Sequence, residues 1–193
     1  ALPEIPVYVD SPLASAVTHV FEQNRDVLDA DFAELAQAIG SVMHPKWVRF
    51  VDAVEDSKKV TASADPCIVI AASGMCEHGR ILHHLKHGIE NAKNAVVIVG
   101  YQAQNTLGRR LVEGEKWVHI FGDMFTRRAE VVVLNAFSAH ADQNELREYV
   151  QKAAPGKVCL VHGELHQRAA LAEVLRADGC EVLIPARGDV VDV

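Results

Sequence analysis

The sequence predicts an α/β fold in which a mostly parallel sheet carries helices on both faces. Short apolar runs rich in valine and isoleucine alternate with helical segments along the whole chain. Parallel strands need long crossover connections, which helices usually supply, so this alternation favours a parallel sheet. With 193 residues and 49% hydrophobic content, the chain is long enough to bury a sizeable core.

The first predicted elements are a strand and a helical hairpin. A strand is expected at residues 5–9, and Ser11-Pro12 after it fits an N-cap followed by proline at the first helical position. Helices are expected over 13–24 and 31–39. We expect this hairpin to cover the sheet.

The rest of the chain repeats strand and helix. The run Ile68-Val69-Ile70 shows no alternation of apolar and polar residues, which is typical of a strand buried on both faces. Further strands are expected at 47–51, 66–72, 95–99, 117–121, 130–134, 157–161 and 181–184, and further helices at 54–62, 79–91, 106–113, 142–153 and 166–177.

The charge balance restricts how the protein binds polyanions. The formal net charge is −7, which argues against a broad nucleic-acid-binding face because such a face is usually basic. A polyanion must therefore be bound locally. The pairs Arg109-Arg110 and Arg127-Arg128 are candidates, although adjacent arginines are more often plain surface charge.

The sequence also suggests a cellular compartment. No apolar stretch approaches the ~20 residues that span a bilayer, and the start lacks the features of a secretory signal, so we expect a cytoplasmic protein without a membrane partner. The four cysteines form no Cys-x-x-Cys pair, and we expect them to be reduced core residues: Cys67, Cys76, Cys159 and Cys180.

Four predicted strands end in loops of unusual composition, at residues 72–75, 100–106, 138–140 and 162–164. In a parallel sheet these ends fall on one edge, where α/β folds build their sites. Small residues let the backbone approach a ligand, and the free N–H groups at the start of the following helix suit a phosphate. The sequence therefore predicts a site at this edge.

His140 and His162 are the leading candidates for chemistry. Each follows a β-type apolar run and precedes a helix start. If their strands are adjacent, about 4.8 Å apart, both side chains can reach one ligand. Asp142, with Glu145 three residues later, resembles a capping box and is interpreted as structural.

Other polar residues have two readings. His83, His84 and His87 have a spacing that can chelate a metal, but the apolar stripe of their helix favours a solvated face. Arg80 and Arg109 each lie near a helix start, where a guanidinium can contact phosphate. A surface salt bridge is at least as good a reading for Arg80, and an equal one for Arg109.

Several segments together resemble one known family. The order and spacing of 70–76, 100–103, 106–110, 137–142 and 160–164 are similar to those of the β-CASP ribonucleases of the metallo-β-lactamase superfamily, and closest to the prokaryotic branch. The resemblance covers essentially the whole chain and implies metal-assisted hydrolysis of RNA by two zinc ions.

The resemblance also implies roles for particular residues. His162 matches a zinc-ligating histidine of the RNA-acting members, and His140 matches a histidine that contacts the scissile phosphate and protonates the leaving oxygen. The residues expected to bind phosphate or to line the RNA cleft are Ser73, Gly74, Met75, Arg109, Ser138 and Ala139.

One family motif is missing. The chain has no His-x-His-x-Asp-His, which supplies most zinc ligands in the family. The resemblance therefore implies the C-terminal part of a longer enzyme, with most of the β-CASP domain at 1–128 and the end of the metallo-β-lactamase domain at 129–193. Its expected partners are RNA, the missing N-terminal half and a second copy of itself. Alone, we expect it to be inactive and to hold no zinc stably.

Two other readings stay open. The chain could be a catalytically silent RNA-binding or scaffold protein that keeps the β-CASP cleft, although it would then need neither histidine. It could also be a nucleotide-binding α/β domain, which the absence of G-x-G-x-x-G and G-x-x-x-x-G-K-[ST] disfavours.

Overall fold

The computed structural model describes residues 5–39, 45–137 and 140–191. It confirms the α/β class, because strands and helices alternate and three of the four described sheets are parallel. The chain divides into two compact units, Ala1–Ser138 and Ala139–Val193. None of the described helices is both long and apolar enough to cross a membrane.

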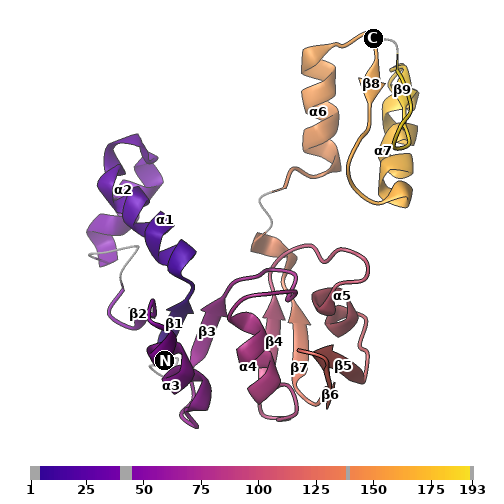
Figure 1. The fold of residues 1–193 in the computed structure, drawn as a ribbon. Coiled ribbons are helices and arrows are strands. Elements are labelled where there is room, and N and C mark those ends of the chain that lie inside the picture. The colour runs from indigo at the N-terminus through magenta and orange to yellow at the C-terminus, as the bar shows by residue number, and fades with distance from the viewer. Residues whose placement is uncertain (1–4, 40–44, 138–139, 192–193) are drawn as a thin grey trace. The chain divides into compact units, whose positions relative to one another are not determined.

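The N-terminal unit begins with a parallel sheet (Figure 1). The strands of this sheet, in the order β2-β1-β3, are β1 (Val7–Asp10), β2 (Val48–Phe50) and β3 (Ile68–Ala71). Its helices are α1 (Pro12–Gln23), η1 (Arg25–Val27), α2 (Ala30–Ile39) and α3 (Val54–Ala62). As predicted, Pro12 opens α1, and the Ser11 side chain accepts a hydrogen bond from the Ala14 N–H.

A second parallel pair follows in the same unit. β4 (Ala95–Ile98) pairs with β7 (Glu130–Val133), and the two lie side by side in Figure 1. The connecting helices are α4 (Ile81–Gly88) and α5 (Leu107–Val112). Their apolar faces pack with these strands around the main core, which includes Leu85, Ile89, Ile98, Leu111 and Val118.

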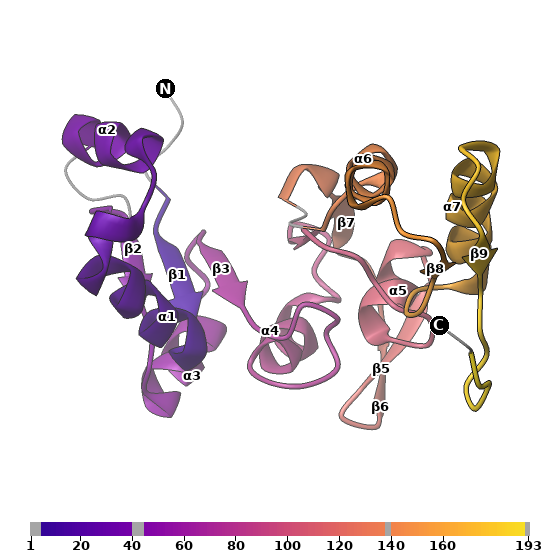
Figure 2. The ribbon, with the colours of Figure 1, turned by 90° about the horizontal axis from the view of Figure 1, so that it is seen from above.

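The sequence did not predict one strand of this unit. β5 (Trp117–Ile120) turns back into β6 (Asp123–Thr126) as an antiparallel hairpin, which lies next to α5 in Figure 2. The two turn residues, Phe121 and Gly122, both have positive φ, the conformation that a tight two-residue hairpin requires. A phenylalanine in that conformation is uncommon, which is why the turn is hard to recognise from sequence.

The C-terminal unit is a small parallel strand pair with two helices. Its elements are α6 (Gln143–Ala153), β8 (Val158–Cys159), α7 (Leu165–Ala177) and β9 (Val182–Leu183). β8 pairs with β9, and Ala172, Leu175 and Val182 form the buried core. The predicted capping box is confirmed, since Asp142 accepts from the Asn144 and Glu145 N–H groups and Glu145 accepts from that of Asp142.

Two predictions about burial are wrong. Ile68 and Ile70 on β3 are about half exposed, at 51% and 54%, so this strand is not buried on both faces. Helix α1 has no buried residue, and Leu13 is 72% exposed, so the hairpin does not cover the sheet. An unbroken apolar run shows that a surface is suited to burial, but not which part of a protein buries it.

The cysteines follow the prediction only in part. All four are free thiols, but Cys159 is exposed, whereas Cys76 lies in the main core. Burial, reinforced by the nearby Glu77 carboxylate, raises the pKa of the Cys76 thiol to about 11. Cys76 therefore stays protonated and behaves as an apolar core side chain.

Candidate functional site

Hydrogen bonds join the loops that follow β3 and β4, although these two strands belong to different described sheets. Gly108 N–H donates to the Met75 carbonyl at 3.0 Å, and Gln102 Nε2 donates to the Gly74 carbonyl at 3.0 Å. The same amide nitrogen also contacts the carbonyls of Gly100 and Tyr101. Gln102 is buried, so its side chain holds the two loops together.

Gly108 makes this close approach possible. A Cβ atom at this position would collide with the Gln102 side-chain oxygen and lie 3.0 Å from the Met75 carbonyl oxygen. Gln102 cannot move away easily, because three carbonyls hold its amide nitrogen. Glycine is therefore required here for packing and not for an unusual φ.

The start of α5 is closed by the protein itself. Leu107 N–H donates to Glu77 Oε1, Gly108 N–H to Met75, and Arg109 N–H to Thr106 Oγ1. The prediction that this helix start has free N–H groups able to bind a phosphate is therefore wrong for α5. The helix start serves to connect the loops.

The predicted phosphate contacts of this unit differ in exposure. Ser73 is half-buried, while Gly74 and Met75 are exposed at the loop surface, where a ligand can reach them. Arg109 Nε forms an ion pair with Glu113 at 2.6 Å along α5. The salt-bridge reading of Arg109 is thus realised in the structure, and its contact with phosphate stays a prediction.

A buried charge cluster lies at the end of β1. Asp10 is fully buried; its Oδ1 pairs with Arg80 at 2.6 Å, and its Oδ2 contacts Ser57 Oγ at 2.6 Å and His84 Nε2 at 2.7 Å. Arg80 also donates to the Val51 carbonyl at 2.7 Å. These contacts join β1, α3 and α4.

This cluster corrects one prediction and decides another. His83 and His87 are exposed, as expected, but His84 is largely buried against Asp10, so the three do not share a solvated face. His84 lies beside the apolar stripe of its helix and points inward, where the buried Asp10 carboxylate is its hydrogen-bond partner. Arg80 takes the ion-pair role that the sequence left open.

The cluster controls the protonation of Asp10. Burial alone would raise the pKa of its carboxyl group, but hydrogen bonds from Ser57, His84 and Arg80, together with the Arg80 charge, outweigh burial and hold the pKa below its usual value. Asp10 is therefore a carboxylate at neutral pH. In the sequence, the only indication that Asp10 has a structural role is its position between a strand and Ser11-Pro12.

The two candidate histidines both lie in the C-terminal unit, and both are exposed. His162 follows β8 and has a positive φ of 68°. β8 pairs with β9, whereas β7, the strand before His140, pairs with β4. The joint site of His140 and His162 stays a prediction, and Ser138 and Ala139 lie outside the described residues.

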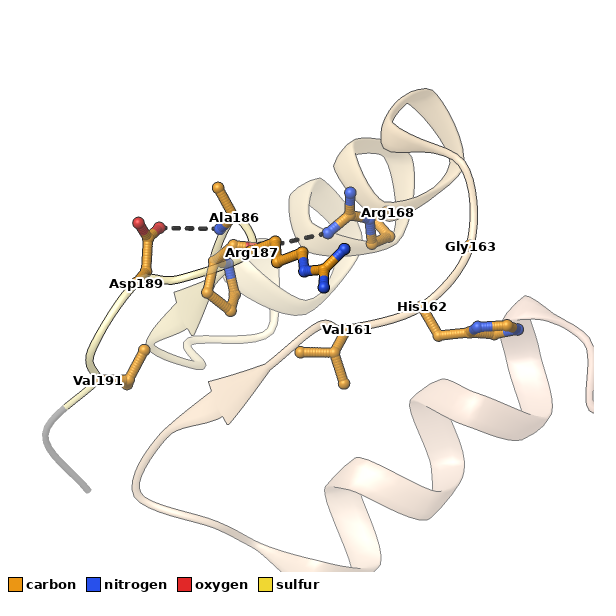
Figure 3. A pocket seen from close by; sticks show the side chains of 9 residues that line it. Val161, His162, Gly163, Arg168, Ala186, Arg187, Asp189 and Val191 are labelled. Carbon is orange, nitrogen blue, oxygen red and sulfur yellow. Dashed lines mark hydrogen bonds between the residues drawn. The ribbon is translucent and has the colours of Figure 1, made fainter. Parts of the chain in front are cut away.

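An open cavity of about 460 Å³ lies beside His162 (Figure 3). Its polar lining residues are His162, Arg168, Arg187 and Asp189. Neither Arg168 nor Arg187 stands out in the sequence, because each is isolated there and only the turn after β9 brings them to one cavity.

The described residues include no group of three or more histidine, cysteine, aspartate or glutamate side chains that could hold a metal ion. A zinc site needs at least three protein ligands. The described part of the chain therefore does not make up a zinc site from its own side chains.

Two family models match the sequence. The Beta-Casp domain matches residues 1–111, and the Zn-dependent metallo-hydrolase RNA specificity domain matches residues 125–185. Together with the α/β fold, these matches show that the chain belongs to the β-CASP family of the metallo-β-lactamase superfamily. This confirms the resemblance read from the strand-end motifs.

Curated relatives agree with this assignment. The chain is 38% identical to Ribonuclease TTHA0252 of Thermus thermophilus over all of its own length and 44% of the relative. It is 32% identical to Transcription termination factor FttA of Methanosarcina mazei, over 84% of the chain and 27% of the relative. An RNase J-like protein of Methanocaldococcus jannaschii is 30% identical over the whole chain and 44% of the relative. The chain thus spans less than half the length of these relatives.

Proposed function

We propose that this chain is part of a zinc-dependent ribonuclease that hydrolyses phosphodiester bonds during RNA processing or decay. The observation that carries the proposal is the pair of segments 137–142 and 160–164, which fall inside the second family match. Each segment places an exposed histidine ahead of a helix. Relatives named as ribonucleases support the same reaction.

His140 acts as the general acid in this proposal. It contacts the scissile phosphate and donates a proton to the leaving oxygen. Histidine is the side chain most often used for such transfers, which typically contribute about 10²–10⁴-fold to the rate. Its exposed position lets substrate reach the ring.

His162 supplies a single metal ligand in this proposal. The other ligands come from a His-x-His-x-Asp-His segment in a preceding half of the protein. We divide the present chain into a β-CASP part at 1–128 and the end of the metallo-β-lactamase part at 129–193. Because one histidine cannot hold zinc, the isolated chain is inactive.

The remaining contacts position the RNA. Ser73, Gly74 and Met75 line the cleft, and Ser138 and Ala139 hold a phosphate near His140. Arg109 can exchange its partner at little cost, because its ion pair with Glu113 is partly exposed and such pairs contribute little to stability.

The partners follow from the same scheme. Ile68, Ile70 and Val97 are about half exposed on their strands, and the preceding half of the protein covers such faces in this proposal. Without that half, exposed apolar area favours self-association, and a homodimer of the isolated chain is expected. The location is cytoplasmic.

The test is hydrolysis of single-stranded RNA by the full-length protein loaded with zinc. We expect cleavage that a chelator stops and zinc restores. His140→Ala should lower turnover about 10²–10⁴-fold, whereas His87→Ala, an exposed histidine on α4, should not change it. RNA that is bound but never cut by the zinc-loaded protein would favour the alternative, a catalytically silent RNA-binding scaffold.

A further inference from the structure

The cavity beside His162 contains two cationic side chains without a carboxylate partner. Arg147 pairs with Asp178 in the same unit, and Lys152 pairs with Glu148. Arg187 makes no hydrogen bond or ion pair with any described residue, and Arg168 reaches only two carbonyls, at 3.4 and 3.5 Å. Two guanidinium groups in one cavity repel each other unless an anion lies between them.

Arg168 also has a hydrogen-bond donor without an acceptor among the described residues. Its Nε atom is buried and has no hydrogen-bond partner among the described residues. A buried donor without a partner is costly, and a water, an ion or a ligand at this position would supply the missing acceptor. The two carbonyl contacts fix the side chain but leave this donor unused.

Arg187 is presented by a closed turn. Ala186 N–H donates to Asp189 Oδ2 at 2.8 Å, and Asp189 N–H donates back to the Ala186 carbonyl at 3.2 Å. Gly188 has a positive φ of 99°, which suits the third residue of such a turn. Figure 3 shows the Asp189 carboxylate away from both guanidinium groups. It accepts the Ala186 N–H bond within the turn.

The helix start next to this cavity is also open. α7 has 13 residues, and the side chain of its N-cap residue, Glu164, makes no capping hydrogen bond. By contrast, side chains cap α5 and α6. Gly163, which lines the cavity, lies just before α7. Glu164 is the acidic group nearest this end; it lies 3.4 Å from His166 Nδ1 and does not line the cavity.

We propose that this cavity binds one nucleotide of the RNA strand, with its phosphate on Arg168 and Arg187. Guanidinium groups form forked, charge-assisted hydrogen bonds with phosphate oxygens. The volume lies in the range of ligand pockets, and Val161, Pro185 and Val191 give apolar walls for the sugar and base. The inference rests on the proposed ribonuclease function and adds a binding subsite beside His162.

The experiment is a ¹H–¹⁵N NMR titration of the 193-residue chain, observing the Gly163 N–H and Arg168 Nε–H signals. The added compounds are inorganic phosphate, a nucleoside 5′-monophosphate and an eight-nucleotide single-stranded RNA. We expect the RNA to bind most tightly. Arg187→Gln should weaken RNA binding about tenfold, as the loss of a hydrogen bond to a charged group does, and should reduce the salt slope by about 0.7.

Lys152→Gln is the matched control, because it removes the same charge from an exposed site on α6 in the same unit. It should leave RNA binding unchanged. Arg187→Lys keeps the charge without the fork and should fall between wild type and Arg187→Gln.

Several results would overturn the subsite. These are no shift with any of the three compounds, inorganic phosphate binding as tightly as RNA, or equal weakening by Arg187→Gln and Lys152→Gln. Hydrolysis by the full-length protein is measured separately. Cleavage with unchanged binding in Arg187→Gln refutes only the subsite, whereas binding through Arg187 without any cleavage refutes only the ribonuclease.

Discussion

The helices α5 and α7 both follow a strand-end loop, yet their first turns differ. At α5, Glu77, Met75 and Thr106 accept the first N–H groups, and Gln102 ties the adjoining loops together. At α7, the side chain of the N-cap residue makes no capping hydrogen bond, and the neighbouring cavity is lined by two arginines. The first N–H groups of α5 thus connect two loops of the protein, whereas the start of α7 lies beside a cavity that a ligand can enter.

Two pairs of arginines, one in each unit, differ in a similar way. Arg80 and Arg109, which the sequence offers as phosphate contacts, pair with Asp10 and Glu113. Arg168 and Arg187, in the C-terminal unit, have no carboxylate partner among the described residues. Substitution of Arg80 should therefore affect folding, and substitution of Arg168 or Arg187 should affect binding.

The largest effect on folding is expected from Asp10→Asn. Removing this buried carboxylate leaves Arg80 and His84 without their shared partner and should lower the free energy of unfolding by about 3 kcal/mol. Both tryptophans, Trp47 and Trp117, lie in the N-terminal unit, so urea unfolding followed by tryptophan fluorescence reports on this unit.

The matched control is Asp56→Asn, which breaks an exposed ion pair with Lys59 on α3. It should change stability far less, because exposed pairs contribute little. Equal losses in the two variants would show that the Asp10 cluster is not a buried support of the fold.

The same cluster predicts a dependence on pH. Because the pKa of Asp10 is lower in the folded protein, its stabilising contribution is complete above its ordinary pKa of about 3.9 and is lost as pH falls through the lowered value. Stability of the N-terminal unit should thus decline below about pH 4 in wild type and less steeply in Asp10→Asn. Asp178, whose pKa Arg147 also lowers, lies in the other unit. Parallel slopes in wild type and Asp10→Asn would contradict the assignment.

A smaller loss is expected from Gly108→Ala. The added methyl group meets the Gln102 side chain and the Met75 carbonyl, and such overpacking should cost about 1–3 kcal/mol. Gly100→Ala is the control within the same pair of loops, because a Cβ there meets nothing within 4 Å. Thermal unfolding followed by tryptophan fluorescence separates the two, and an unchanged midpoint for Gly108→Ala would mean that the loops are not held together at this point.

The smallest effect on folding is expected from Arg187→Gln. The Arg187 side chain is exposed and forms no hydrogen bond or ion pair with a described residue, so the unfolding midpoint followed by circular dichroism should match wild type. Arg176→Gln is the comparison variant, because Arg176 donates to the Val182 carbonyl at 2.8 Å inside this unit. Loss of this hydrogen bond should lower the unfolding midpoint. A clear loss of stability in Arg187→Gln would make this arginine part of the scaffold.

Local patterns in the sequence predicted much of the fold. The Ser11-Pro12 helix start, the Asp142 capping box and the alternation of strands and helices depend on neighbouring residues and are confirmed. The Asp10 cluster joins residues 47 to 74 positions apart, and the cavity joins Arg168 to a turn after β9. Such sites depend on tertiary packing, so no local pattern marks them.

Burial of the sheets was the other point that the sequence could not predict. The apolar run at Ile68 looks the same whether the covering layer belongs to this chain or to another part of a longer protein. The family motifs, in contrast, were recognisable because their residue order is preserved along the chain.

Zinc content and turnover of His140→Ala and His162→Ala, measured together in the full-length protein, test the central proposal most directly. His162→Ala should lose both zinc and activity, because it removes a metal ligand. His140→Ala should keep wild-type zinc and lose turnover, because it removes only the proton donor. Equal zinc loss in both variants, or full activity in either, would contradict the division of roles.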